Sequence, residues 1–152
     1  MRFRTEVQAN CEDEIIIRCA ERNDKIKHLE KIIENTLGGD AEMILTLGDA
    51  EYFVPKASLL FFETSGGKVT AHTRERMYYA DATLFQLEEI LPEWFMRVSK
   101  SCILNVREVC AMSRNITGNG EVLFKDTDKK VYVSRGYYHA LKEKIYTTRG
   151  LK

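Results

Sequence analysis

Three short segments of the chain combine small hydroxyl or glycine residues with a single cation. They are Ser65-Gly66-Gly67-Lys68, Ser99-Lys100-Ser101 and Ser134-Arg135-Gly136. Small residues let a backbone amide come close to a phosphate, and Lys or Arg can pair with a phosphate or bond to the edge of a base. These segments therefore have the chemistry of nucleic-acid contacts, although polar loops of this kind also occur where nothing binds.

The motifs of common enzymes are missing. The sequence has no phosphate-binding loop, no G-x-G-x-x-G, no H-E-x-x-H and no G-x-S-x-G. Ser99 and Lys100 are neighbours on an extended segment, so their side chains point to opposite faces and are poorly placed to activate each other. We expect no catalytic residue and no cofactor. Each histidine is expected to be a surface or packing residue: His28, His72 and His139.

The cysteines point away from a metal site. Cys11, Cys19, Cys102 and Cys110 form no C-x-x-C pair and have no histidine at ligand spacing. Cys19 and Cys102 lie in apolar runs, where a thiol usually acts as a small hydrophobe. Buried free thiols are therefore expected, with a disulfide or a metal site as the minor alternative.

Length and composition indicate one domain of ordinary size, or one domain plus a small accessory unit. The chain has 152 residues, of which 44% are hydrophobic and 30% charged, as in a globular protein. No apolar run approaches the ~20 residues of a membrane-spanning helix. The N-terminus lacks the apolar stretch of a secretory signal, so we expect a cytoplasmic protein.

The charge is unevenly distributed, although the net charge is zero. Residues 1–54 hold 7 Lys and Arg against 12 Asp and Glu, a net charge of −5, whereas residues 55–152 hold 16 against 11, a net charge of +5. A basic half favours an anionic partner. The excess is modest, so it supports a nucleic-acid partner without establishing one.

Residues 1–40 read as a strand, a second strand and a helix. Arg2–Val7 alternates polar and apolar residues, and Ile15–Ile17 is a β-branched run. From Asn23, which can cap a helix, apolar residues recur every three or four positions until Gly38-Gly39. We place a domain boundary at these glycines and expect residues 1–40 to be a dimerisation or regulatory extension, or a purely structural one.

Residues 41–152 have the pattern of a mainly β domain, so the fold class is α+β overall. Short strands alternate with glycine-containing or charged turns. One helix follows Asp81 or Thr83, either of which can cap it, and another follows Ser134. The expected strands are 43–47, 52–54, 59–63, 69–72, 77–80, 95–98, 102–104, 109–112, 122–124 and 131–133.

Four blocks in this half resemble a known family, the LytTR DNA-binding domain. They are Phe62–Val69, Leu84–Leu91, Phe95–Asn105 and Val133-Ser134-Arg135 before a tyrosine-bearing helix. The resemblance covers roughly residues 45–147, and its most specific part is Phe-x-Arg-x-Ser-Lys-Ser-x-Ile-x-Asn. It implies an elongated domain of small antiparallel sheets with few helices, which contacts DNA through loops.

The resemblance also implies particular DNA contacts. It places Lys68 in the first contacting loop, Lys100 at the central position between Ser99 and Ser101, and Arg135 at or beside the third. At that third loop some relatives have the arginine one place later, where this chain has Gly136. The full set expected to contact DNA is Lys68, Arg97, Ser99, Lys100, Ser101, Arg135 and Tyr137.

Two members of the motif have a structural alternative. Arg97 and Asn105 alternate with apolar strand residues, so each can instead bond a turn carbonyl or an adjacent strand. The aromatic residues inside strand runs are expected in the core rather than stacked on bases. They are Phe61, Phe62, Trp94, Phe95 and Phe124.

The sequence thus predicts a regulator of transcription that binds specific double-stranded DNA as a homodimer on a repeated site. Residues 1–54 are too few for the receiver domain that many LytTR members carry, so we expect control by another route, such as a membrane-protein partner. The alternative is a β-rich protein-interaction module that never contacts nucleic acid.

Overall fold

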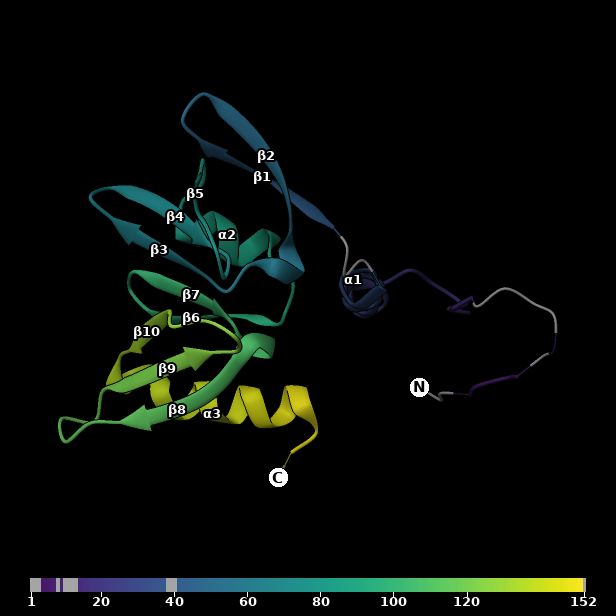
Figure 1. Cartoon of the computed structure of the whole chain (residues 1–152). Helices are drawn as coiled ribbons and strands as arrows, with labels where there is room; N and C mark the ends of the chain where they lie inside the picture. The colour runs from purple at the N-terminus through teal and green to yellow at the C-terminus, as the bar shows by residue number, and fades with distance from the viewer. Residues whose placement is uncertain (1–3, 8, 10–13, 38–40, 152) are drawn as a thin grey trace.

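The structure of the chain is a computed structural model that describes residues 4–7, 9, 14–37 and 41–151. Within these residues it has three α-helices and ten β-strands (Figure 1). The helices are α1 (Asp24–Leu37), α2 (Leu84–Ile90) and α3 (Arg135–Arg149), with 3-10 turns η1 (Lys56–Ser58) and η2 (Val106–Glu108). The strands are β1 (Glu42–Leu47), β2 (Ala50–Pro55), β3 (Phe61–Ser65), β4 (Lys68–His72), β5 (Met77–Ala80), β6 (Phe95–Ser99), β7 (Cys102–Asn105), β8 (Val109–Arg114), β9 (Gly120–Phe124) and β10 (Lys130–Val133).

The strands of the described residues form two antiparallel sheets. Seven are arranged in the order β2-β1-β5-β4-β3-β7-β6, and three in the order β10-β9-β8. β1 is in register with β5 at one residue pair, Thr46 opposite Tyr79, so the β1–β2 hairpin is attached narrowly to the rest of the sheet. All of the strands predicted for residues 41–152 are present, and the expected fold class is confirmed.

One continuous hydrophobic core joins the two sheets. The predicted aromatic residues Phe61, Phe62, Trp94, Phe95 and Phe124 are all buried. The ring of Phe61, on β3, stacks on that of Phe124, on β9, with centroids 5.6 Å apart. α2 packs against β3, β6 and β7, and α3 packs against β6 and η2. The connections between strands are thereby anchored to a rigid core.

The helix ends follow from local sequence, except that Ser134 does not cap α3. Thr83 caps α2 in a reciprocal arrangement with Gln86, so the cap is Thr83 rather than Asp81. Ser134 precedes α3 but makes no capping bond; its hydroxyl instead donates to the carbonyl of Val98 at 3.3 Å. The short helix α2 buries only Leu84 and Leu87, and Ile90 at its end is 54% exposed.

The strand predictions for the N-terminal extension are wrong where the structure describes it. Residues 4–7 and 14–19 are in no strand; two short strands without a surface to cover are not stable in water. Arg2, Phe3 and the expected stop at Gly38-Gly39 lie outside the described residues. The helix is confirmed: α1 starts after Asn23, whose side chain accepts from the backbone amide of Ile26 at 3.1 Å.

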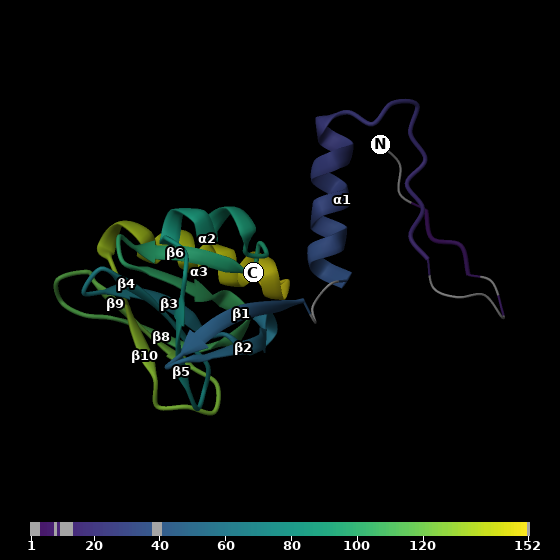
Figure 2. The same ribbon diagram turned by 90° about the horizontal axis from the view of Figure 1, so that it is seen from above.

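The extension lies to one side of the β domain. In Figure 2, α1 stands next to β1 and β2, at the end of the molecule opposite the turn between β3 and β4. Within the described residues, no helix is both long enough and apolar enough to cross a bilayer.

Candidate nucleic-acid interface

The three segments predicted to carry DNA contacts lie at one edge of the molecule. The turns between β3 and β4 and between β6 and β7 both lie there, as does the junction of β10 with α3 (Figure 1, left). The loop between β8 and β9 lies at the same edge. Chain segments that are remote in sequence therefore form a row, which we call the loop edge: residues 65–68, 99–102, 114–120 and 134–137.

Hydrogen bonds join each member of the loop edge to the next. The backbone amide of Thr64 donates to the carbonyl of Ser101 at 2.8 Å, which ties the first turn to the second. The amide of Ser134 donates to Val98 at 3.1 Å, at the end of β6. The amide of Arg135 donates to Oδ1 of Asn119 at 3.1 Å, which ties α3 to the β8–β9 loop. The turns that carry the cations are thus joined to one another by hydrogen bonds.

The first turn requires glycine. Gly66 and Gly67 have φ angles of +60° and +77°, as a tight hairpin turn with two left-handed residues demands. A Cβ at either position would meet no atom within 4 Å, so backbone conformation rather than crowding selects glycine. Lys68 is exposed, and its ammonium lies 5.5 Å from the ring centroid of Tyr79. The cation is therefore at the surface of the loop edge.

The second turn is held from below by Arg97. Its Nε donates to the carbonyl of Ser99 at 2.8 Å, and its terminal nitrogen donates to the carbonyl of Lys100. The same guanidinium lies 3.4 Å from a carboxylate oxygen of Glu88 on α2. Arg97 thus bonds turn carbonyls, as the structural alternative supposed. Lys100 and Ser101 are exposed at the turn itself.

The serines of this turn stabilise each other. The hydroxyl of Ser99 accepts from the amide of Ser101 at 3.3 Å, and the two hydroxyl oxygens are 3.5 Å apart. Asn105, the last residue of the motif, is buried: its amide donates to the carbonyl of Leu59 at 2.9 Å and its oxygen accepts from Arg107. Asn105 is therefore a structural residue.

The third segment places Arg135 against the β8–β9 loop. A Cβ on Gly118 would lie 2.7 Å from Cδ of Arg135, so the stem of the arginine crosses directly over this glycine. Gly118 also has a φ of +88°. Tyr137 is 38% exposed, whereas Tyr138 packs partly against the core with the Arg114 guanidinium 4.2 Å from its ring centroid.

Sequence reasoning missed the β8–β9 loop as part of this edge. Residues 115–120 signalled only a glycine-containing turn, because the loop itself carries no cation. Asn119 and Gly118 act on Arg135, which is remote in sequence. No local pattern reports such a contact.

The histidines and cysteines are away from any reactive arrangement. Burial, with help from the Lys129 ammonium, lowers the pKa of His72 from 6.5 to about 4. Its ring stacks on Phe61, with centroids 4.2 Å apart.

The cysteines differ in burial. Burial, and then the Glu63 carboxylate, raises the pKa of the Cys102 thiol. Cys19 and Cys110 are exposed, which corrects their predicted burial: the segment around Cys19 is not a strand, and Cys110 lies on an exposed position of β8.

Among the described residues, no three His, Cys, Asp or Glu side chains are grouped as metal ligands. Cys11, the remaining cysteine, lies outside these residues.

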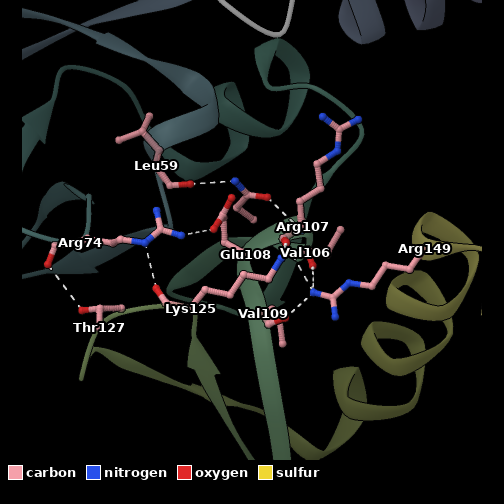
Figure 3. A network of polar contacts seen from close by, with 10 residues as sticks. Leu59, Arg74, Val106, Arg107, Glu108, Val109, Lys125, Thr127 and Arg149 are labelled. Atoms are coloured by element: carbon pink, nitrogen blue, oxygen red, sulfur yellow. Dashed lines mark hydrogen bonds and ion pairs between the residues drawn. The ribbon is translucent and has the colours of Figure 1, made fainter.

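A polar network holds the two sheets in one orientation (Figure 3). Arg74, just after β4, pairs with the carboxylate of Glu108 on η2 and donates from Nε to the carbonyl of Lys125 at 2.9 Å. The hydroxyl of Thr127 donates to the carbonyl of Arg74 at 3.5 Å. From α3, Arg149 donates to the carbonyls of Val106, at 3.2 Å, and Val109. These contacts fix the small sheet against the large one and thereby preserve the loop edge.

The fold and the row of cations define a β-rich module suited to nucleic acid. The model of the LytTr DNA-binding domain family matches residues 49–146. This is more than half of the chain, so the chain belongs to the LytTR DNA-binding domain family. The predicted resemblance is confirmed.

Relatives and a solved structure agree with this assignment. The chain is 27% identical, over 95% of its length and 98% of the relative's, to an uncharacterised HTH-type transcriptional regulator of Staphylococcus aureus (strain bovine RF122 / ET3-1). It is 25% identical to the sensory transduction protein LytT of Bacillus subtilis, over 74% of this chain and 47% of LytT. The LytTr DNA-binding domain of a Bacillus cereus protein described as a methyl-accepting/DNA response regulator has the same fold, with a TM-score of 0.64 and 21% identity, over 70% of this chain and 98% of that one.

Proposed function

We propose that the protein is a sequence-specific transcriptional regulator that binds double-stranded DNA through its loop edge. The observation that carries this proposal is the row of exposed cations Lys68, Lys100 and Arg135, on turns that hydrogen bonds join in sequence. A cation on a rigid turn can reach a phosphate or a base edge without ordering a flexible segment on binding. Membership of a DNA-binding family supports the same conclusion.

Different residues of the loop edge have different roles in this proposal. Lys100 is the candidate for reading a base in the major groove, and Lys68 and Arg135 are candidates for pairing with phosphates. The hydroxyls of Ser99 and Ser101 and the phenol of Tyr137 are suited to phosphate oxygens, which accept hydrogen bonds without regard to sequence. Arg97 supports the turn from beneath.

Loops, rather than a recognition helix, would read the DNA. A helix-turn-helix needs two helices joined by a short turn. In the part of the chain that the structure describes, α2 and α3 are separated by strands β6 to β10. The HTH-type description of the staphylococcal relative therefore does not extend to this chain's architecture.

The assembly that we propose is a homodimer on a repeated site, located in the cytoplasm with its DNA. The extension, residues 1–40, would be a dimerisation or regulatory element, and a membrane protein is the proposed regulatory partner. Because α1 lies opposite the loop edge (Figure 2), either partner could bind there without covering the DNA contacts. No enzymatic step is part of this function.

Selection of genomic fragments by the purified full chain tests the proposal. We expect enrichment of a repeated sequence, with retention that falls steeply as salt is raised, because phosphate contacts release counterions. A variant carrying Lys68→Ala, Lys100→Ala and Arg135→Ala should lose both the enrichment of a repeated sequence and the salt-dependent retention of DNA. If the wild-type chain retains no fragment at low salt, the protein is instead the interaction module of the alternative hypothesis.

A further inference from the structure

An open sheet edge and an apolar segment both occur near the N-terminal extension. β2 is the terminal strand of the seven-stranded sheet, so one side of its backbone is available for pairing. Ile15 and Ile16 are each 59% exposed, although they belong to a β-branched run that favours strands. The edge of β2 lacks a neighbouring strand, and the segment around Ile15 and Ile16 lacks a strand to pair with.

We propose that residues 14–18 of one copy of the chain pair as an extra strand with β2 of a second copy, and reciprocally. The result is a symmetric homodimer in which two identical segments are exchanged. This inference deepens the homodimer of the proposed function by naming its interface.

β2 carries exposed apolar side chains on one face and borders an open groove of mixed polarity on the other. On the outer face, Phe53 of β2 lies opposite Ile44 of β1, and these side chains are 63% and 58% exposed. On the inner face, Tyr52 and Val54 line an open groove of about 450 Å³, whose lining also includes residues 73–76 and Tyr78. An added strand would therefore find exposed apolar side chains on its outer face and an open groove on its inner face.

In one antiparallel register between residues 14–18 and β2, the isoleucines lie opposite apolar residues of β2 on both faces and Arg18 lies opposite Glu51. If Arg18 lies opposite Glu51, then Ile16 lies opposite Phe53 on the outer face, because alternate residues share a face. Ile15 and Ile17 then fall opposite Val54 and Tyr52, on the groove side. A shift by one residue would exchange the two faces and lose the ion pair.

The geometry favours pairing of residues 14–18 with β2 of a second copy over pairing with β2 of their own chain. α1 has 14 residues, about 21 Å of helix, and its first turn points away from the sheet (Figure 2). Residues 14–18 precede α1 and lie beyond it as seen from β2 of the same chain. The exchanged strands would also leave both loop edges uncovered, because these lie at the other end of each molecule.

Sedimentation of the full chain without DNA is the first test. Ile16→Asp and Phe53→Asp should each weaken dimerisation roughly tenfold or more, since each places a charge where an apolar side chain is buried. Ile116→Asp is the matched control: Ile116 is fully exposed at the tip of the β8–β9 loop, and its replacement should leave the dimer intact. A monomeric wild-type chain, or a dimer insensitive to Ile16→Asp, overturns the inference.

Charge reversal distinguishes exchange from pairing within one chain. Arg18→Glu and Glu51→Arg should each weaken the dimer several-fold, by opposing like charges. Mixing the two variants should restore a dimer containing one copy of each, because both interfaces then join opposite charges. If only the doubly substituted chain recovers and the mixture does not, the segment docks within its own chain and the inference fails. Lys100→Ala should dimerise normally, so a failure of the DNA proposal leaves this test unaffected.

Discussion

The guanidinium of Arg97 lies beneath the turn that carries Lys100, with Nε donating to the carbonyl of Ser99 at 2.8 Å. A second donor of the same side chain reaches the carbonyl of Lys100 itself. Two carbonyls of a three-residue turn are therefore held by one planar group, and Glu88 of α2 lies 3.4 Å from its other terminal nitrogen. Arg97 thereby sets the position of the lysine-bearing turn, which is the structural role that the sequence left open for it.

Arg97→Lys and Arg97→Ala should both weaken DNA binding several-fold, because each removes hydrogen bonds worth ~0.5–1.5 kcal/mol apiece from the turn. Lysine keeps the charge but cannot bridge two carbonyls with a planar fork. The measurement is affinity as a function of salt. The slope of log affinity against log salt should be unchanged in both variants. A slope reduced by about one in Arg97→Ala, and restored in Arg97→Lys, would show a phosphate contact instead.

Lys100→Ala should cost about 1–3 kcal/mol of DNA binding and relax the preferred base at one position, if Lys100 contacts a base edge. Lys25→Ala is the matched control, since Lys25 is an exposed lysine on α1, away from the loop edge. The measurement is the affinity and the preferred sequence that each variant shows in a selection of binding sites from random DNA. Unchanged affinity and unchanged preference in Lys100→Ala would remove this residue from the interface.

Gly118→Ala should impair DNA binding about as much as Arg135→Ala. A methyl group at Gly118 would lie 2.7 Å from the Arg135 side chain, and a φ of +88° is strained for alanine, at about 1 kcal/mol of stability. Because both changes act on the same contact, the double variant should be little worse than either one. Additive losses in a titration with the selected site would show that the two residues act independently.

The pattern of the β domain could be read from sequence because its signals are local. The turn glycines 66 and 67, the capping pair Thr83 and Gln86, and the alternating strands all depend on near neighbours. Residue types alone singled out the three cation-bearing segments, but only the family resemblance predicted that they contact DNA together. The hydrogen bonds that align it, such as Thr64 to Ser101, join residues that no periodicity relates.

The errors came where tertiary context decides. Ile15–Ile17 has strong strand propensity, but propensity makes a strand only when an edge is available. Ser134 is a good capping residue, yet its hydroxyl bonds to Val98 instead. Cys19 looked buried because its neighbours are apolar, but the segment lies outside the core. In each case the sequence did not reveal which segment of the fold, if any, the residue would contact.

Stability should fall as the pH drops from about 6.5 to about 4. In the folded protein burial holds the pKa of His72 at about 4, whereas an unfolded histidine has a pKa of 6.5. Between these values the unfolded chain binds one more proton than the folded protein, so acidification favours unfolding, and this contribution levels off below about 4. Urea unfolding of wild type and His72→Phe across this range measures it. The variant should show the smaller pH dependence; identical curves would rule out His72 as its source. His139→Phe, at an exposed histidine, is the control.

Arg74→Ala should destabilise the protein by about 1–3 kcal/mol, because it leaves the half-buried Glu108 carboxylate and the Lys125 carbonyl without their donor. Arg76→Ala, at an exposed arginine two residues along, should cost much less. Arg74→Ala/Glu108→Ala should cost less than the sum of the single changes, since the second removes the acceptor that the first leaves unpaired. The measurement is denaturant unfolding of the wild type, the three single variants Arg74→Ala, Arg76→Ala and Glu108→Ala, and the double variant. Equal losses for Arg74→Ala and Arg76→Ala would show that the network in Figure 3 does not join the sheets energetically.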